Sequence, residues 1–217
     1  MYYNIYTNIK TNTEYNIKDI KKEEDSKMVE NDTLIEKCAI DISDFADIEE
    51  AFKYFSNLSK ENSLCKQISP TSFQYKDYFI DLGAKFVLTP HAIGLEKVQG
   101  YNLSCAPKLI AYSDTKNNKS CTLITKIPGC SNSNPTPYKN VSSQVSIGAK
   151  RNFLNDLKTL AQNNIVNIST EDINNWYTTP ETGCIIISNW SDFASFRDEK
   201  AKNIYLKRMS ENLGLIY

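Results

Sequence analysis

Residue types that carry nucleophilic or metal chemistry are sparse in this chain of 217 residues. The one histidine is His91, so a Cys-His or Ser-His dyad would have to use it, and a histidine cluster for zinc is excluded. His91 follows Pro90 where a helix is expected to begin, which indicates a capping or surface residue. The six cysteines are scattered without a Cys-x-x-Cys pair, which favours reduced thiols, and their even number keeps the disulfide alternative open.

Glycines are too dispersed to form a phosphate-binding loop. The chain has seven, and no two of them lie within three residues of each other. Several backbone amides therefore cannot be brought against a phosphate by a Gly-rich turn. A nucleotide-binding fold in this chain would be an aberrant one.

The polar side chains with the most suggestive spacing lie in residues 165–193. A loop, Ile165-Val-Asn-Ile-Ser-Thr-Glu-Asp172, follows a strongly amphipathic helix and leads to Trp176-Tyr177. A turn at Pro180-Glu-Thr-Gly183 then precedes an apolar strand, which ends at Ser188-Asn189-Trp190-Ser191-Asp192. The predicted order is helix, irregular loop, short strand, glycine turn and a second strand that ends in polar residues.

This order resembles the catalytic centre of protein kinases, and its spacing is like that of the smallest kinase effectors that bacteria inject into host cells. In kinases a loop Asp acts as base, an Asn five residues later binds magnesium, and a metal-binding Asp ends the next strand. Asn175 matches the metal-binding Asn, and Asn189, fourteen residues later, matches the strand-end Asp. Ile124-Thr-Lys-Ile-Pro-Gly129 is similar to the Val-Pro-Gly hinge of those effectors.

The residues themselves depart from the kinase pattern. The same alignment puts Thr170 at the base position, and threonine cannot serve as a carboxylate base. A second register, similar to another minimal effector kinase, makes Asp172 the base, and both registers stay open. Asn189 lacks the negative charge that holds magnesium, and Asp192, three residues later, is a further candidate ligand. The resemblance therefore implies a catalytically degraded kinase.

For the N-terminal half, the resemblance implies a lysine on the strand before a helix and a glutamate on that helix. Lys76 or Lys85 is the expected lysine, and Glu96 is the expected glutamate. ATP with magnesium is the cofactor pair that these residues would hold, and otherwise no cofactor is expected.

Apolar periodicity predicts the helices that would position these residues. Steps of three and four residues predict a helix over 40–58, with Asp41, Ser43 or Asp44 as its cap. Further helices are expected over 89–103, with Pro90 near its start, over 150–163 and over 198–213.

Two hairpins are expected between the first helices. Aromatic and β-branched residues over 72–88 predict strands broken near Gly83-Ala84, and 109–112 and 121–125 read as paired strands joined by an Asn- and Asp-rich turn. The sequence thus predicts an α+β class, and with the resemblance a reduced two-lobed, protein-kinase-like fold.

The local amino-acid composition indicates where the domain begins and where it divides. Residues 1–36 are polar with little apolar pattern and are predicted to be a disordered leader. One domain is expected over 37–217, with a small lobe of about 37–127 and a large lobe of about 128–217, because the breaker-rich loop 128–137 is the best internal boundary.

The charge balance and hydropathy of the chain exclude some classes of binding partner. With 25 Lys and Arg against 26 Asp and Glu, the chain lacks the basic field that nucleic acid requires. No apolar run reaches the roughly 18 to 20 residues of a membrane span. We therefore expect a soluble monomer that does not bind nucleic acid and does not span a membrane.

Three functions fit these features. The first is a host-directed effector or toxin-like pseudokinase that binds a host protein, since the polar leader looks like the export signals of proteins delivered into a host cytosol. The second is an active atypical kinase in which Asp172 and Asp192 hold nucleotide and magnesium. The third is an interaction module with Trp176, Tyr177 and Trp190 as surface anchors, core packing being the other interpretation of both tryptophans.

Overall fold

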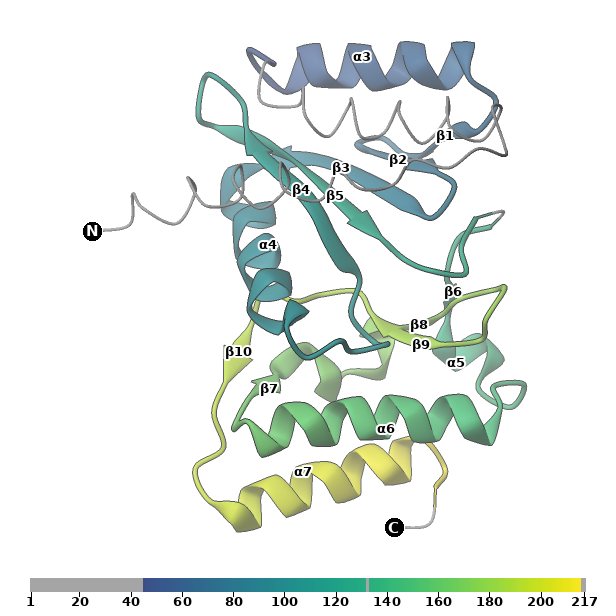
Figure 1. Cartoon of the computed structure of the whole chain (residues 1–217), viewed down its shortest axis with the longest axis vertical. Coiled ribbons are helices and arrows are strands. Elements are labelled where there is room, and N and C mark those ends of the chain that lie inside the picture. The colour runs from purple at the N-terminus through teal and green to yellow at the C-terminus, as the bar shows by residue number, and fades with distance from the viewer. Residues whose placement is uncertain (1–44, 132, 216–217) are drawn as a thin grey trace, which may run out of the picture. The chain divides into compact units, whose positions relative to one another are not determined.

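The computed structural model describes residues 45–131 and 133–215, which form the predicted α+β fold (Figure 1). The predicted leader, residues 1–36, lies outside the described residues. Within those residues, helices α3 to α7 combine with antiparallel strand pairs. We call residues 45–126 the sheet part and residues 127–215 the helical part.

A five-stranded antiparallel sheet is the centre of the sheet part, with strand order β1-β2-β3-β5-β4. The strands are β1 (Cys65–Ser69), β2 (Ser72–Tyr75), β3 (Tyr78–Ala84), β4 (Lys108–Asp114) and β5 (Ser120–Lys126). The predicted pairing of 109–112 with 121–125 is confirmed. Strand β1 was not predicted.

The first hairpin turns at a different place from the one predicted. Strands β2 and β3 are joined at Lys76 and Asp77, where Lys76 adopts a left-handed backbone with φ of 51°. Strand β3 continues through Gly83 to Ala84, because its register with β5 extends that far. The predicted break at Gly83-Ala84 is therefore wrong.

Helix α4 (Lys85–Gln99) begins earlier than predicted and includes residues 86–88, which were expected in a strand. The Lys85 amide donates to the Lys119 carbonyl at 3.0 Å, which fixes the point where the chain leaves the sheet. Ala92, Leu95 and Val98 are its buried side, and the helix packs on β3, β4 and β5. Pro90 consequently lies inside the helix and not at its first position.

Helix α3 (Ile48–Glu61) also packs on the sheet, through Phe55 against Phe73 with ring centroids 5.8 Å apart. Its cap is Asp47, whose carboxylate accepts from the amides of Glu49 and Glu50 at 3.0 Å each. The predicted caps at 41, 43 and 44 lie outside the described residues, and the observed cap replaces them.

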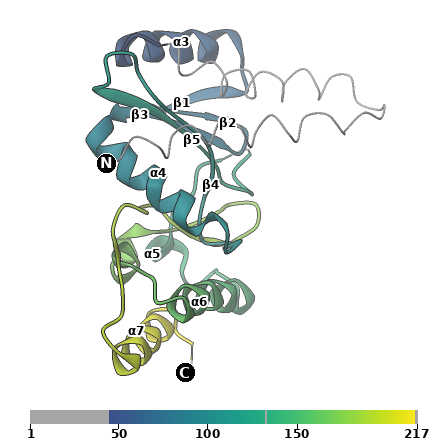
Figure 2. The ribbon, with the colours of Figure 1, turned by 60° about the vertical axis from the view of Figure 1, so that its left-hand side comes forward.

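The helical part is built on three helices and short strand pairs (Figures 1 and 2). The helices are α5 (Tyr138–Val141), α6 (Ile147–Gln162) and α7 (Glu199–Asn212). The strands are β6 (Thr136–Pro137), β7 (Val166–Asn167), β8 (Trp176–Thr178), β9 (Ile185–Ile187) and β10 (Phe193–Ala194). They form a three-stranded sheet in the order β6-β8-β9 and a two-stranded sheet of β7 and β10. Helices α6 and α7 agree with the predicted helices over 150–163 and 198–213.

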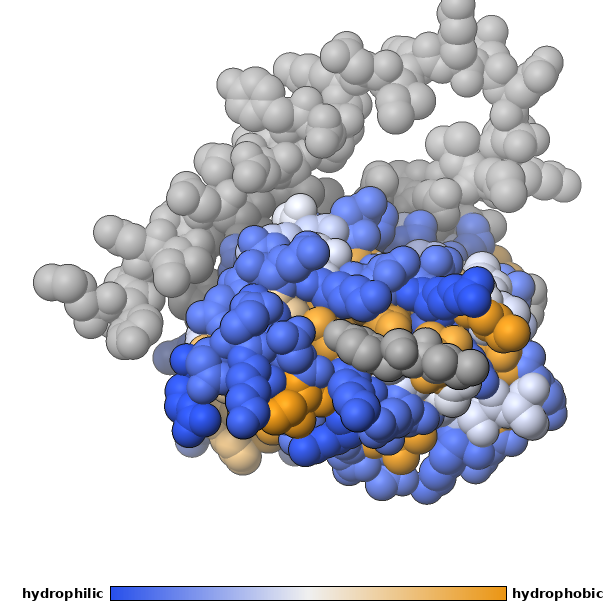
Figure 3. All heavy atoms as spheres, turned by 90° about the horizontal axis from the view of Figure 1, so that it is seen from below, coloured by the Kyte–Doolittle hydropathy of each residue, from blue (hydrophilic) through white to orange (hydrophobic). Residues whose placement is uncertain are grey.

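The helical part has an apolar core to which α4 also contributes. Both tryptophans are fully buried in it, together with Phe153 of α6 and with Leu95 from α4. Trp176 and Trp190 are therefore core residues, and the interpretation of these two side chains as surface anchors is wrong. The face on the side of α7 is mainly hydrophilic, with only small hydrophobic areas (Figure 3).

Candidate functional site

The loop and the strand end singled out by the sequence lie next to each other. The loop consists of two short 3₁₀ helices, η2 (Ile168–Glu171) and η3 (Ile173–Asn175). The Asn175 carbonyl accepts from the Ser188 amide at 2.9 Å, and the Ile168 amide donates to the Asp192 carbonyl at 3.0 Å. The backbone thus brings the three predicted metal positions, 175, 189 and 192, to one region.

The side chains at these positions are engaged in local hydrogen bonds. Asn175 donates its amide to the Ser169 carbonyl at 3.1 Å. The Asn189 oxygen accepts from both the amide and the hydroxyl of Ser191, at 2.9 and 2.8 Å. Asp192 is exposed and accepts from the same hydroxyl at 3.3 Å.

This donor set does not fit a magnesium ion as the side chains lie. Magnesium takes six oxygens in near-ideal octahedral geometry and prefers carboxylates. The amide oxygen of Asn189 is already shared by two donors, and Asp192 is the one carboxylate among the three positions. Within the described residues, no three His, Cys, Asp or Glu side chains are grouped as a metal site.

Thr170, the base position in one register, is a buried structural residue. It is fully buried, its hydroxyl donates to the Asn167 carbonyl at 2.7 Å, and it lies 2.6 Å from the Tyr205 hydroxyl of α7. Its carbonyl accepts from the Trp176 indole at 3.1 Å. Burial raises the pKa of Tyr205, so this hydroxyl stays protonated and available as a donor. Thr170 connects the loop to α7.

Asp172, the base position in the other register, is exposed and caps η3. One carboxylate oxygen accepts from both the backbone amide and the side-chain amide of Asn174, at 2.9 and 2.8 Å. This Asx turn explains why the loop turns here. Asp172 is therefore the one candidate base whose carboxylate reaches solvent.

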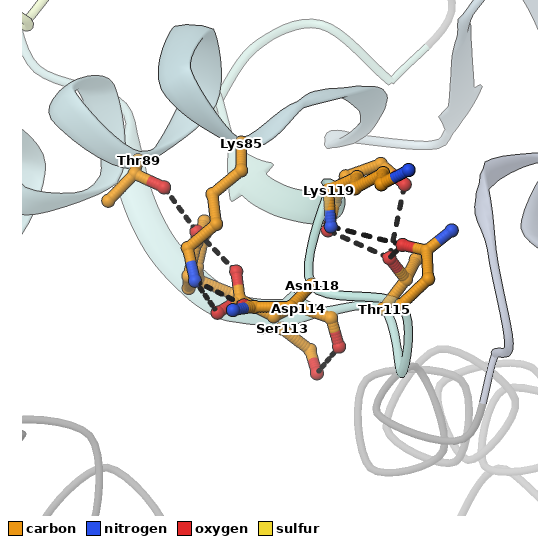
Figure 4. A network of polar contacts seen from close by, with 10 residues as sticks. Lys85, Thr89, Ser113, Asp114, Thr115, Asn118 and Lys119 are labelled. Atoms are coloured by element: carbon orange, nitrogen blue, oxygen red, sulfur yellow. Dashed lines mark hydrogen bonds and ion pairs between the residues drawn. The ribbon is translucent and has the colours of Figure 1, made fainter.

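The predicted cofactor-binding residues lie apart from the loop. Lys85 donates to Asp114 and Asn118, at 2.5 and 2.6 Å (Figure 4). Lys76 lies in the β2-β3 turn, with its ammonium 5.7 Å from the Tyr75 ring centroid. Glu96 is exposed on α4, roughly 16 Å from Lys85 along the helix axis at 1.5 Å per residue. The structure does not bring either lysine together with Glu96.

An acid in the central sheet was missed by the sequence reasoning. Asp81 of β3 accepts from the Ser72 hydroxyl at 2.5 Å. Burial raises the pKa of this carboxyl, and the Ser72 hydrogen bond counteracts part of the rise. Phe79 lies on the same face of the strand, two residues earlier. The available signal was a charged residue inside the apolar run Tyr78-Phe-Ile-Asp-Leu82.

Apolar side chains pack where the central sheet meets strands β8 and β9. Phe79, Ile127, Cys130 and Ile186 form one buried cluster, with Ile68 and Tyr177 packed against it. Polar bonds reinforce this contact, because Asp77 accepts from the Cys130 amide at 3.2 Å and from the Ser131 hydroxyl at 2.6 Å. The cluster joins the sheet part to the helical part.

Helix α4 contacts Trp190, which follows the end of strand β9, through His91 and Gly94. The Trp190 amide donates to Nδ1 of His91 at 3.4 Å. Burial lowers the pKa of His91 to about 4, so the ring is neutral at pH 7 and its Nδ1 is free to accept. A Cβ atom at Gly94 would lie 1.6 Å from the Trp190 carbonyl oxygen. His91 is thus a partly buried residue inside α4 that contacts the strand end, and the prediction that it caps the helix is wrong.

The described cysteines are not joined in disulfides, as the reduced-thiol prediction expects. None of the helices in residues 45–131 and 133–215 is long and apolar enough to cross a bilayer. No protein family matches the chain, and no curated protein matches it significantly.

Proposed function

We propose that this chain has a reduced two-lobed, kinase-like fold without phosphotransferase activity, and that it acts by binding a protein partner. The order of elements supports the kinase-like fold. Hairpin β2-β3, helix α4 and hairpin β4-β5 are followed by α6, the irregular loop, β8, a turn with Gly183 in the left-handed region and β9. This is the order on which the resemblance depends.

The observation that carries the loss of catalysis is the burial of Thr170. In the kinase-like register this residue stands where a carboxylate must accept the substrate proton. Its hydroxyl is instead used by Asn167 and Tyr205 inside the core. A group in this position contributes stability and has no route to a substrate.

Two further features support the same conclusion. The neutral Asn175 and Asn189 carry no charge to hold magnesium, and the Asn189 side-chain oxygen already accepts from Ser191. The contact between the sheet part and strands β8 and β9 is filled by the Phe79 cluster. Because these features disfavour phosphoryl transfer, we expect the chain to act through an exposed surface that recognises another protein.

The test is a phosphotransfer assay with labelled ATP, magnesium or manganese, and host-cell extract. Wild type is compared with Asp172→Asn, which removes the carboxylate charge and keeps the oxygen that caps η3. We expect no transfer by either protein and no thermal stabilisation by ATP. Transfer by wild type that the variant loses would overturn the proposal and establish the active-kinase alternative.

The proposal includes action in a host cytosol as a monomer. It rests on the resemblance to injected effectors and on the polar composition of residues 1–36. A reporter enzyme fused after residue 36 and expressed in a secreting bacterium tests export, and light scattering of the purified chain tests the oligomeric state. Absence of the reporter from host cells would remove the export part and leave the pseudokinase part unaffected.

A further inference from the structure

A groove runs along the outer side of α4. Its volume is about 740 Å³, within the range of sites that hold small ligands or a few side chains. Six of its lining residues are Phe86, Pro90, Ile93, Lys97, Lys119 and Phe193. None of the residues of the loop 168–175 lines this groove.

The apolar residues of the groove are unusually exposed. Phe86 is 81% exposed and Ile93 52% exposed, so water covers two large side chains on one helix. Positions 86, 90, 93 and 97 recur at steps of four and three and lie on one face of α4. Exposed apolar residues that line a hollow mark an interaction site more often than scattered ones do.

One wall of the groove, the first turns of α4, is held in place by hydrogen bonds to the β4-β5 hairpin. Lys85 binds Asp114 and Asn118, and Thr89 contacts the Tyr112 hydroxyl, which donates to Asp114 at 2.8 Å (Figure 4). These contacts hold the first turns of α4 to the β4-β5 hairpin. A preformed wall reduces the ordering cost of binding.

The charged residues that line the groove indicate which kind of partner it would bind. Its lining includes three lysines and no acidic residue, although the whole chain has a net charge of −1. Lys85 is neutralised by Asp114, so Lys97 and Lys119 carry the local field. The Lys97 ammonium lies 4.9 Å from the centroid of the Phe193 ring, at the apolar wall itself. An apolar hollow beside two exposed lysines complements a peptide with an apolar anchor and flanking carboxylates.

We infer that the α4 groove is the docking site for an acidic segment of the protein partner, whose aromatic or aliphatic side chain enters between Phe86, Ile93 and Phe193. This inference rests on the proposed partner-binding function. A nucleic acid fits less well, because two lysines beside an apolar hollow supply few phosphate contacts.

The test begins with a phage-displayed random peptide library selected on wild type and counter-selected on Ile93→Ser. Enriched peptides are then measured by fluorescence anisotropy against wild type, Ile93→Ser and the double variant Lys97→Glu with Lys119→Glu. The matched control is Ile204→Ser on α7, because Ile204 is also 52% exposed. All substituted side chains are exposed, so we expect unchanged melting temperatures.

We expect enriched peptides that combine Asp or Glu with Phe, Tyr or Leu. Ile93→Ser and the double lysine variant should each weaken binding on the order of tenfold, a difference of about 1.4 kcal/mol, while Ile204→Ser binds like wild type. Basic or uncharged enriched peptides, or equal binding by Ile93→Ser, would refute the inference. Tighter binding of an oligonucleotide or a phosphatidylserine vesicle through the same lysines would replace the peptide by that ligand and also refute it.

The outcome is independent of the phosphotransfer assay. Peptide binding that Ile93→Ser loses supports the groove even if wild type transfers phosphate, in which case the proposed function fails alone. Partner binding in host extract that Ile93→Ser and the lysine variant retain would refute the groove and leave the proposed function standing.

Discussion

Two polar side chains of the helical part, Thr170 and Tyr205, are buried together with a hydrogen-bond partner. Thr170 and Tyr205 satisfy each other inside the core, thirty-five residues apart in the chain. Such a pair matters because a buried hydroxyl left without a partner costs about 1 to 3 kcal/mol. The position that resembles a catalytic base has thus become part of the packing between the loop and α7.

His91 predicts a pH dependence of stability. Its pKa falls from 6.5 to about 4 on folding, mainly because burial disfavours the charged ring. The unfolded chain therefore binds a proton at a higher pH than the folded chain. The stability that this histidine contributes is present above pH 6.5 and is lost as the pH falls toward 4. Protonation of Nδ1 would also remove the acceptor for the Trp190 amide.

The measurement is the free energy of unfolding by denaturant at pH 7 and pH 5. Wild type should lose more stability than His91→Gln, which removes the chain's only histidine and keeps a side-chain acceptor. The carboxylates titrate in both proteins, so the difference between the two losses isolates His91. Equal losses would show that folding does not lower the pKa of His91.

Among the helices, α4 packs on the central sheet and also contributes to the core of the helical part. This helix begins directly after β3. Its residues Leu95 and Val98 pack in the core of the helical part, and it contacts Trp190 after the end of β9. A glycine at position 94 permits the last of these contacts. The position of this helix therefore determines both the candidate groove and the geometry of the segment 188–193.

Replacing Gly94 by alanine should be strongly destabilising. In an ordinary helix the change would stabilise by about 0.5 to 1 kcal/mol. Here the new Cβ would lie 1.6 Å from the Trp190 carbonyl oxygen and 2.6 Å from the Phe193 ring, so α4 must move or lose its contact. We expect a loss of several kcal/mol, as for other overpacked core sites.

Thermal unfolding followed by circular dichroism measures the effect. Gly100→Ala at the end of α4 is the control, because a Cβ there meets no atom within 4 Å. We expect the control to melt near the wild-type temperature. If Gly94→Ala melted with it, the close approach of α4 to Trp190 would be wrong.

Elements with a clear apolar periodicity could be predicted from the sequence. Elements whose bounds depend on contacts with other elements could not. Helix α6 has a regular apolar stripe, so its place follows from the chain alone. The start of α4 depends on how far β3 pairs with β5, and strand propensity at Phe86 and Val87 gives the wrong answer there. Neutral residues at 170 and 189 could be read from the spacing, whereas the contact of Thr170 with Tyr205 on α7 depends on tertiary packing.

At the scale of the whole described chain, the sheet part and the helical part share structure. The Phe79 cluster joins the sheet to β9, and α4 packs on the sheet while filling the helical core. Neither part can lose its packing without exposing apolar side chains of the other. A single cooperative unit is the expected consequence.

Two probes of denaturant unfolding test this cooperativity. Both tryptophans lie in the helical part, so their fluorescence follows the packing of that part and of α4 against it. Far-ultraviolet circular dichroism follows both parts. We expect coincident transitions with one midpoint. A fluorescence midpoint clearly separated from the dichroism midpoint would show that the two parts unfold independently.

The contact between Gly94 and Trp190 also defines how divergent relatives of this chain can be recognised. A side chain at position 94 cannot be tolerated while the 188–193 segment keeps its path, so evolution can change this position only together with that segment. Chains that share the fold should retain a glycine near the middle of this helix, or vary it jointly with the strand-end residues. That paired variation is a search criterion that requires no overall sequence similarity.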